Sequence, residues 1–301
     1  MNAQNRRRFL QTSAALMAQG LLPRAVAQPV KRGMRLGLII GVEKDPDAAI
    51  AKVHSLGLPT CQASTSDFST EMVTRLKDAL EKYGVEATAI NTHGPGPDVY
   101  DFYQGPLTIG LVPREYRQQR IEHFKRASDF ARQVGVPALH SHFGFIPENP
   151  NDPVYAETVE ACREVVAYLK GNNQMVLYET GQETPITLLR LIKDVGLDNQ
   201  GINLDCANLI LYGKGNPVDA LDVIGHYVHG LHAKDGLFPT DPRKLGEEVP
   251  IGKGKADFPR LFKHLKELNY TGPVTIEREI SGPQQMEDIN KEKAYLEKLI
   301  G

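Results

Sequence analysis

MVLYETGQETPITLLRLIKDVGLDNQGINLD, residues 175–205, contains one full repeat of the pattern that decides the fold. A short apolar run at 175–179 ends in a glutamate, an amphipathic stretch covers 184–195, and a second apolar run at 201–205 ends in an aspartate. Apolar runs of this length predict buried strands, and the stretch between them predicts a helix. A strand, a crossover helix and a second strand form a parallel pair.

The same alternation occupies the chain from Met34 to its C-terminus. Strands are predicted at 34–40, 59–64, 86–92, 137–144, 175–179, 201–205, 228–234 and 273–277. Helices are predicted at 46–56, 70–83, 114–134, 154–171, 184–195, 217–225, 258–268 and 284–300. Such repeats predict an α/β fold, a single-domain (β/α)8 TIM barrel.

A doubly wound open sheet is the alternative architecture, and two glycine-rich segments bear on it. HGPGPD at 93–98 does not match the G-x-G-x-x-G pattern of nucleotide-binding sheets, and its prolines oppose a helix start. GKGK at 252–255 lacks the other residues of a phosphate loop. Both segments are predicted to be turns, so the barrel is favoured.

The connection between His93 and Arg114 is much longer than the few residues that a strand-to-helix loop needs. It is rich in proline, glycine and aromatic residues. A long loop of this kind more often covers or lines a binding site than not, so we expect it to be a lid or a binding loop.

The N-terminus has the pattern of a cleavable export signal. Arginines at 6–8 precede a mildly apolar run without acidic residues, and a small-residue site, Ala-Val-Ala, ends at position 27. This is typical of the twin-arginine route. We therefore divide the chain into a signal peptide at 1–27 and a barrel domain at 28–301, and we expect the mature protein in the periplasm.

Composition restricts the partners of the mature chain. Cleavage at 27 removes four arginines and takes the formal net charge from −2 to −6, so nucleic acid is not an expected partner. After the signal, no apolar run is long enough to span a bilayer. The three cysteines are too few and too scattered for a zinc cluster or disulfide framework, and we expect them to be buried. The sequence leaves open whether the protein forms a homo-oligomer.

The carboxyl ends of barrel strands meet at one mouth, so the last inward residue of each strand is informative. In chain order these residues are His93, His142, Glu179, Asp205, His232 and Glu277. Three buried carboxylates require a cation. Glu179, Asp205, His232 and Glu277 are the predicted ligands of a divalent metal ion. Mn²⁺ is favoured, with Mg²⁺, Co²⁺ or Zn²⁺ as alternatives.

The stretch VHGLHAKDG, residues 228–236, contains His232 and Lys234, two residues apart on a predicted strand. Alternation along a strand puts Gly230, His232 and Lys234 on the barrel side and turns His229 outward. Lys234 lies one step nearer the mouth than His232, where an ammonium can stabilise a developing oxyanion. The alternative is a salt bridge to Asp235 or Glu277. His140, deeper than His142 on its strand, is predicted to be a core residue.

These residues resemble the xylose isomerase-like TIM barrels, a family that includes ketose 3-epimerases, hydroxypyruvate isomerase, inosose dehydratase and AP endonucleases. The similar segments are YETGQET (178–184), NLDCANLILYGKGNP (203–217), HAKDG (232–236), IGKGKADFP (251–259) and VTIERE (274–279). The resemblance implies a divalent ion on the four predicted ligands. In the epimerases it also implies that Glu179 and Glu277 act as acid and base on a metal-bound enediolate.

Two positions depart from the epimerase pattern. Glu183 follows Glu179 more closely than the substrate-binding carboxylate of the epimerases does, and Asn208 stands where they tend to have histidine. HAKD instead is similar to the dehydratases. We expect Glu183 and Asn208, with His93 and His142, to bind substrate. The chain has no tryptophan, so Tyr100, Tyr103, Phe143 and Phe145 are the candidates for stacking on a sugar.

The favoured function is a metal-dependent isomerase or epimerase of a free, non-phosphorylated sugar or keto-sugar, with Glu179, Glu277 and Lys234 as catalytic residues. The alternative is a lyase or dehydratase that performs elimination on a keto-sugar, a 3-keto-glycoside or an inosose-like substrate. A periplasmic binding protein that has lost the chemistry is a third hypothesis. An AP endonuclease is disfavoured by the acidic mature chain.

Overall fold

A closed barrel of parallel strands forms the body of the protein. The computed structural model describes residues 33–301, so the predicted signal at 1–27 and the first residues of the 28–301 domain lie outside the described part. The strands are hydrogen-bonded in the order β1-β10-β7-β6-β5-β4-β3-β2, and β1 closes on β10. The predicted barrel is confirmed, and the open sheet is excluded.

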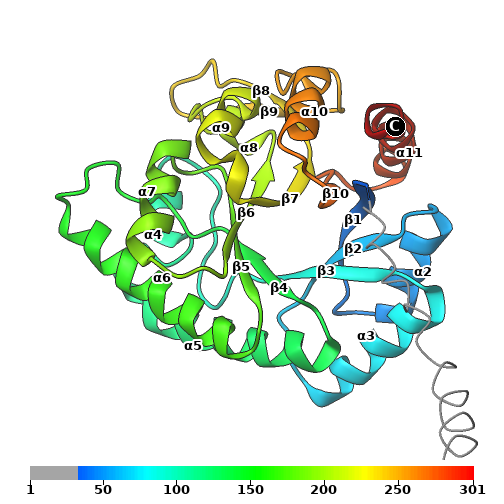
Figure 1. The fold of residues 1–301 in the computed structure, drawn as a ribbon, viewed down its shortest axis with the longest axis horizontal. Helices are drawn as coiled ribbons and strands as arrows, with labels where there is room; N and C mark the ends of the chain where they lie inside the picture. Colours follow the sequence, from blue (N-terminus) through cyan, green and yellow to red (C-terminus); the bar gives the residue numbers. More distant parts are fainter. Residues whose placement is uncertain (1–32) are drawn as a thin grey trace, which may run out of the picture. The chain divides into compact units, whose positions relative to one another are not determined.

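The eight predicted strands and eight predicted helices are all present, with ends that differ by a few residues. The barrel strands are β1 (Arg35–Gly41), β2 (Thr60–Ser64), β3 (Glu86–Asn91), β4 (Ala138–Ser141), β5 (Met175–Glu179), β6 (Gln200–Asp205), β7 (Val228–Ala233) and β10 (Pro273–Ile276). The helices that follow them are α2 (Pro46–Ser55), α3 (Thr70–Tyr83), α5 (Arg114–Val134), α6 (Pro153–Gly171), α7 (Pro185–Val195), α9 (Pro217–Ile224), α10 (Phe258–Glu267) and α11 (Pro283–Ile300). Figure 1 shows the strands as a central ring with these helices around it.

Helix starts and ends follow from local residues. The side chains of Asp45 and Ser69 accept hydrogen bonds from backbone N–H groups in the first turns of α2 and α3. Gly84 and Gly135 end α3 and α5 in the left-handed conformation, which glycine adopts without steric cost. These signals are local, which is why sequence periodicity located the helices well.

Several short elements were not predicted. They are α4 (Gly105–Thr108), α8 (Asn208–Leu211), the 3-10 helix η1 (Gly225–Tyr227) and an antiparallel hairpin of β8 (Asp235–Leu237) and β9 (Glu247–Val249). Elements of three or four residues span too few repeats of the helix or strand pattern for that pattern to be recognised in the sequence. The hairpin directly follows β7 and extends the chain beyond the barrel.

The segments predicted as turns, 93–98 and 252–255, contain neither helix nor strand. The second turn is fixed by Asp235, whose buried carboxylate accepts hydrogen bonds from the N–H groups of Gly236, Gly252, Gly254 and Ala256 at 2.9–3.0 Å. A Cβ on Gly254 would lie 2.2 Å from an Asp235 oxygen, so only glycine fits there. The GKGK segment is therefore a structural turn.

Two kinds of interior are distinct. The main hydrophobic core is aliphatic and aromatic, whereas buried polar side chains from the strands, such as Gln62, Asn203 and Thr275, are hydrogen-bonded or packed inside the barrel. Cys61, Cys162 and Cys206 are buried and unpaired, as predicted. Within residues 33–301, no helix has the length and apolar character needed to cross a membrane.

Candidate metal centre and active site

The four predicted ligands meet at the carboxyl ends of β5, β6, β7 and β10, which are neighbours in the barrel. One ligand atom from each of Glu179, Asp205, His232 and Glu277 lies within 4.8 Å of the others. His232 Nδ1 lies 3.2 Å from a Glu179 oxygen, 3.6 Å from an Asp205 oxygen and 3.0 Å from a Glu277 oxygen. The structure therefore brings the whole predicted set together.

Gln62 on β2 determines which nitrogen of His232 faces the carboxylates. The Gln62 amide nitrogen donates to Asn203 Oδ1 at 2.9 Å, and its carbonyl oxygen lies 2.6 Å from His232 Nε2. A carbonyl oxygen only accepts, so Nε2 carries the proton and donates it. Nδ1 is then available as a metal ligand, with the second ring nitrogen hydrogen-bonded as in other histidine-ligated sites.

The unpaired atoms of this group fit a divalent cation. Asp205 Oδ1 accepts from the N–H groups of Ala207 and Asn208 at 2.8 and 2.7 Å, which turns Oδ2 toward His232. Asp205 Oδ2 and His232 Nδ1 are buried and form no hydrogen bond among the described residues. Buried polar atoms of this kind are costly unless something binds them.

Electrostatics also favour a cation at this place. Burial raises the pKa of Asp205 to about 7, against the opposing effect of Lys234. Burial alone would lower the pKa of His232, but the Glu277 and Glu179 carboxylates hold it well above its usual value. An imidazolium here substitutes for a metal ion as counter-charge. A divalent ion would neutralise two of the three negative charges of the ligand carboxylates, and the Lys234 ammonium lies beside Glu277 and Asp205.

Lys234 is buried at the rim of the ligand group, on the same face as His232. Its Nζ lies 2.8 Å from Glu279, 3.4 Å from Glu277 and 3.7 Å from Asp205. Burial lowers its pKa, but the three carboxylates outweigh that effect and keep the ammonium charged. His229 is exposed, as the strand alternation predicts. The salt bridge to Glu277 that was weighed for Lys234 is present, and it leaves the ammonium beside the ligand group.

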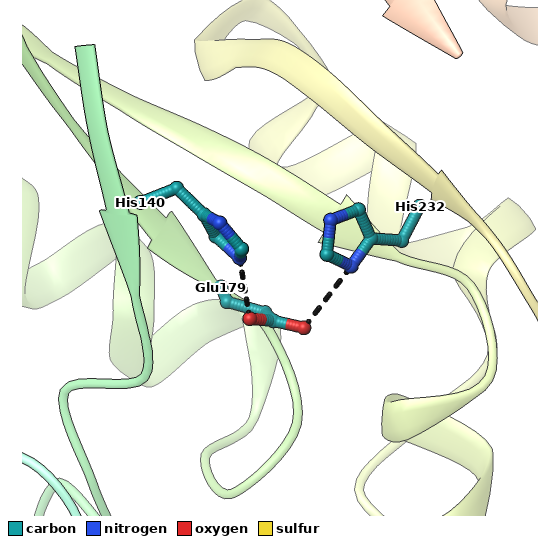
Figure 2. A group of neighbouring side chains, drawn as sticks. All are labelled: His140, Glu179 and His232. Carbon is teal, nitrogen blue, oxygen red and sulfur yellow. Dashed lines mark hydrogen bonds and ion pairs between the residues drawn. The ribbon is translucent and has the colours of Figure 1, made fainter. Parts of the chain in front are cut away.

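His140 is buried, as predicted, but it also contacts the ligand group. Figure 2 shows its ring beside the Glu179 carboxylate, with His232 on the other side of that carboxylate. His140 Nε2 lies 2.5 Å from Glu179, and Nδ1 lies 3.0 Å from the Asn91 side-chain nitrogen. The Asn91 oxygen already accepts from Ser64, so its nitrogen donates to Nδ1, and Nε2 donates to Glu179. His140 therefore orients this carboxylate. It lies close enough to Glu179 and His232 to form a second group of potential ligand atoms, but both of its ring nitrogens are hydrogen-bonded in this arrangement.

A cavity of about 660 Å³ opens above the ligand group. Its lining includes Glu179 and Glu277 together with His93, Tyr100, His142 and Asn208. His142 lies 3.4 Å from Glu179, and Asn208 lies within 3.4 Å of both Glu179 and Lys234. Three of the four predicted substrate-binding residues thus face the same space as the ligands. Glu183 is buried and is not among the lining residues, so its contact with substrate stays a prediction.

Comparison with known sequences identifies the group to which this barrel and site belong. A family model described as xylose isomerase-like TIM barrel matches residues 50–299. The chain belongs to that family. The resemblance inferred from the sequence segments is confirmed.

Solved structures and curated proteins agree with membership of the xylose isomerase-like barrels. The chain is similar to the crystal structure of a xylose isomerase domain protein from Planctomyces limnophilus, with 35% identity, a TM-score of 0.83, and coverage of 89% of this chain and 97% of that one. It is 28% identical to an L-ribulose-5-phosphate 3-epimerase from Salmonella typhimurium over 70% of this chain and 71% of the relative. D-psicose 3-epimerase from Clostridium cellulolyticum shares the fold, with 15% identity, a TM-score of 0.67, and coverage of 89% and 99%.

In this xylose isomerase-like barrel the long loop after β3 contributes to the site. Tyr100 lines the cavity, and its hydroxyl lies 2.9 Å from Asp98 and 3.1 Å from His93 Nδ1. Arg120 of α5 is buried and donates to the carbonyl oxygens of Pro95, Pro97 and Gly110 at 2.7–3.0 Å. Arg120 thus holds the backbone of the loop whose Tyr100 side chain lines the cavity. That it is a binding loop has support, and that it moves as a lid stays a prediction.

The remaining aromatic candidates differ in position. Phe143 is buried against Phe124 and Tyr178, so it belongs to the core. Tyr103 is 58% exposed, and neither it nor Phe145 is among the cavity-lining residues. Tyr212 does line the cavity and was not predicted.

Other site residues were missed although a signal existed. Gln62, Asn91 and Ser64 lie on β2 and β3 at positions that face inward, and they support His232 and His140. Reading only charged groups and histidines at strand ends overlooked them. Polar residues that alternate with apolar ones near the end of a barrel strand are the signal that would have found them.

Proposed function

We propose that this protein is a divalent-metal-dependent sugar isomerase or epimerase that acts on a free sugar or keto-sugar. The observation that carries the proposal is the buried group of three carboxylates and one imidazole, of which Glu179 and Glu277 line the cavity. The similarity to an L-ribulose-5-phosphate 3-epimerase over most of the chain supports the same class of chemistry.

Glu179, Asp205, His232 and Glu277 would hold the ion. When bound, a divalent ion supplies a Lewis acid that stabilises negative charge on the oxygen of a substrate carbonyl. Glu179 and Glu277 are the proposed acid and base for the hydrogen on the neighbouring carbon. They come from β5 and β10, which β6 and β7 separate in the barrel, so they approach the cavity floor from different strands.

The surrounding side chains position these two glutamates and the substrate. His140 holds Glu179 by a hydrogen bond, and Lys234 lies 3.4 Å from Glu277, where its ammonium keeps that carboxylate ionised. Burial alone would raise the pKa of Glu277, but Lys234 and His232 hold it well below its usual value. His93, His142 and Asn208 are the proposed contacts for sugar hydroxyls, because all three line the cavity.

Metal identity, substrate and location belong to the same proposal. Oxygen-rich ligand sets with one imidazole suit Mn²⁺, which we propose as the resident ion. From the export signal predicted at 1–27 we propose a periplasmic location, where phosphorylated sugars are scarce. A free sugar is therefore the proposed substrate.

Elimination on a keto-sugar is the second candidate function, and Lys234 favours it. A lyase needs an acid for the leaving group as well as a base for the proton. Lys234 is a charged donor beside Glu277 at the rim of the ligand group, so it could protonate a departing oxygen. Isomerisation and elimination would then share the same first proton removal.

Incubation of the Mn²⁺-loaded protein with free ketoses and 3-keto sugars in D₂O separates the two. An isomerase or epimerase incorporates deuterium at the carbon beside the carbonyl without loss of mass from the substrate. A lyase releases water or the substituent, which mass spectrometry detects. Full activity in protein shown by elemental analysis to be metal-free would overturn both.

A further inference from the structure

Gly41, the last residue of β1, faces the mouth of the barrel. Its register partner on β2 is Ser64, whose partner on β3 is Asn91, and Asn91 bonds His140 beside Glu179. Residues paired in a parallel sheet point to the same side, so a side chain at 41 would project into the barrel mouth. A Cβ placed there would meet nothing within 4 Å. The space is open because the residue is glycine.

Two hollows meet at this position. The cavity of about 660 Å³ above the ligands and a second hollow of about 410 Å³ are both lined by Gly41, Ser64 and His93. Cavities of roughly 300–1,000 Å³ accommodate drug-sized ligands, which are larger than one sugar ring. A single ring on the ligands would therefore leave the second hollow empty.

The lining of the second hollow is suited to a hydroxylated group. Beyond the three shared residues it consists of Glu43, Lys44, Thr65, Ser66, Thr92 and Gly94. The hydroxyls of Thr65, Ser66 and Thr92 are already hydrogen-bonded to Asp67, Glu43 and His123, so the Glu43 carboxylate and the Lys44 ammonium are the charged groups that face a ligand. None of the lining residues is a large apolar side chain. Glu43 accepts hydrogen bonds from the N–H and hydroxyl of Ser66, which fixes its carboxylate at the edge of the hollow. A sugar ring has both hydroxyl groups and an apolar face, so it fits a lining that combines carbon surface with the charges of Glu43 and Lys44.

We propose that the substrate is a two-ring carbohydrate, with its carbonyl-bearing ring on the ligand group and its second sugar ring in the hollow beyond Gly41. The inference rests on the proposed sugar chemistry and names its substrate class. Gly41 is the residue that determines this specificity. It lines both hollows, so a side chain at this position would occupy the space through which the two sugar rings are connected.

The test measures binding and exchange separately. Lactulose and maltulose are D-fructose units that carry a second ring at O4 and retain a free carbonyl, so each is compared with D-fructose. Dissociation constants come from titration calorimetry of the Mn²⁺-loaded protein, and deuterium incorporation is followed in D₂O. We expect at least one disaccharide to bind about tenfold more tightly than D-fructose, a difference of about 1.4 kcal/mol.

Gly41→Leu should remove that advantage, lowering disaccharide affinity by about tenfold more than it lowers D-fructose affinity. Gly171→Leu is the matched control, because a Cβ added to Gly171 would also meet nothing within 4 Å, and this residue ends α6 in the helix layer rather than at the mouth. Gly41→Ala should reduce the affinity advantage of the disaccharide less than Gly41→Leu does, because a methyl group fills less of the space between the two hollows.

The inference is overturned if no disaccharide binds more tightly than D-fructose, or if Gly41→Leu weakens both ligands equally. A preference for disaccharides without any deuterium incorporation or elimination would instead contradict the proposed function and leave the second-ring site standing. Circular dichroism of each variant confirms that it has folded.

Discussion

Gln62 on β2 contacts the predicted metal ligand His232 on β7 across the inside of the barrel. It accepts the Nε2 proton of His232 and donates to Asn203, so the tautomer and the ring orientation are set by one amide. A ligand whose orientation is fixed in advance binds a metal ion with less loss of conformational freedom. The affinity of the site therefore depends on a residue that is not itself a ligand.

Gln62→Met should weaken Mn²⁺ binding by about 10–100-fold, because His232 loses the acceptor that holds Nδ1 toward the carboxylates. Calorimetric titration with Mn²⁺ measures the effect. Gln200→Met is the matched control, since Gln200 is also a buried, hydrogen-bonded glutamine but lies at the start of β6, away from Asp205. Equal losses of affinity in the two variants would contradict the role of Gln62.

Glu277→Gln should lower kcat by about 10²–10⁴-fold, because a neutral amide cannot carry the proton. If the substitution only weakened metal binding, activity should recover when Mn²⁺ is in excess. Asp205→Asn supplies that comparison: we expect its activity to recover at saturating Mn²⁺ and that of Glu277→Gln to stay low. If both recover alike, Glu277 is a ligand without a role in proton transfer.

At the scale of elements, α5 and the loop after β3 act as one unit. The buried guanidinium of Arg120 holds three backbone carbonyls of the loop, and the loop in turn places Tyr100 in the cavity. Helix α5, which follows the loop in sequence, thus holds the loop backbone through Arg120. Loop position is coupled to the packing of α5.

Arg120→Met should free the loop and weaken substrate binding by about tenfold, since three charge-assisted hydrogen bonds are lost. Hydrogen exchange of residues 94–110 and the KM for substrate are the measurements. Arg126→Met, an exposed position on the same helix, should change neither. Unaltered exchange in the loop of Arg120→Met would show that other contacts hold it.

The sequence predicted the barrel and the convergence of four candidate ligands well, because both depend on local, repeated patterns. Each strand run ends in a chemically distinctive residue, and parallel topology alone brings Glu179, Asp205, His232 and Glu277 to one mouth. Local patterns do not show how deep within the barrel a side chain lies. His140 could be assigned to the core, but its contact with Glu179 depends on the register between β4 and β5.

Loop residues were harder for the same reason. Glu183 and Asn208 both follow strand ends, yet Asn208 lines the cavity whereas Glu183 is buried without lining it. Sequence spacing gives the distance along the chain and not the direction in which an irregular loop turns. The hydrogen bonds of Asp235 to the 252–256 turn could not be predicted either. Their donors are backbone N–H groups, which nearly every residue has.

At the scale of the whole molecule, the C-terminal helix α11 is attached to the turn beside the mouth through a buried carboxyl. Glu292 is 3% exposed and accepts a hydrogen bond from the N–H of Ile251 at 3.1 Å, while its second oxygen has no partner among the described residues. Burial raises the pKa of Glu292 to about 7, which the N–H of Ile251 offsets only in part. This helix therefore docks best with Glu292 protonated.

The pH dependence follows from that raised pKa. The folded state binds the proton more tightly than the unfolded chain, so the stabilisation is complete below about pH 4.5 and is lost as pH rises through 7. Glu292→Gln should therefore stabilise the protein by about 1–3 kcal/mol at pH 8 relative to its effect at pH 4.5. Thermal unfolding at the two pH values measures it. Glu297→Gln, exposed on the same helix, should show no such difference, and a pH-independent effect of Glu292→Gln would contradict the assignment.

Closure of β1 onto β10 has a consequence for when the proposed metal site can form during folding. Glu277 directly follows β10, the last strand of the barrel, while Gln62 lies on the second strand from the start. A chain still attached to the ribosome lacks the final carboxylate and has nothing to seal its first strand. The proposed metal centre would consequently be complete only after β10 has been synthesised and has paired with β1, so the cell compartment in which folding is completed would decide which metal ions are available to it.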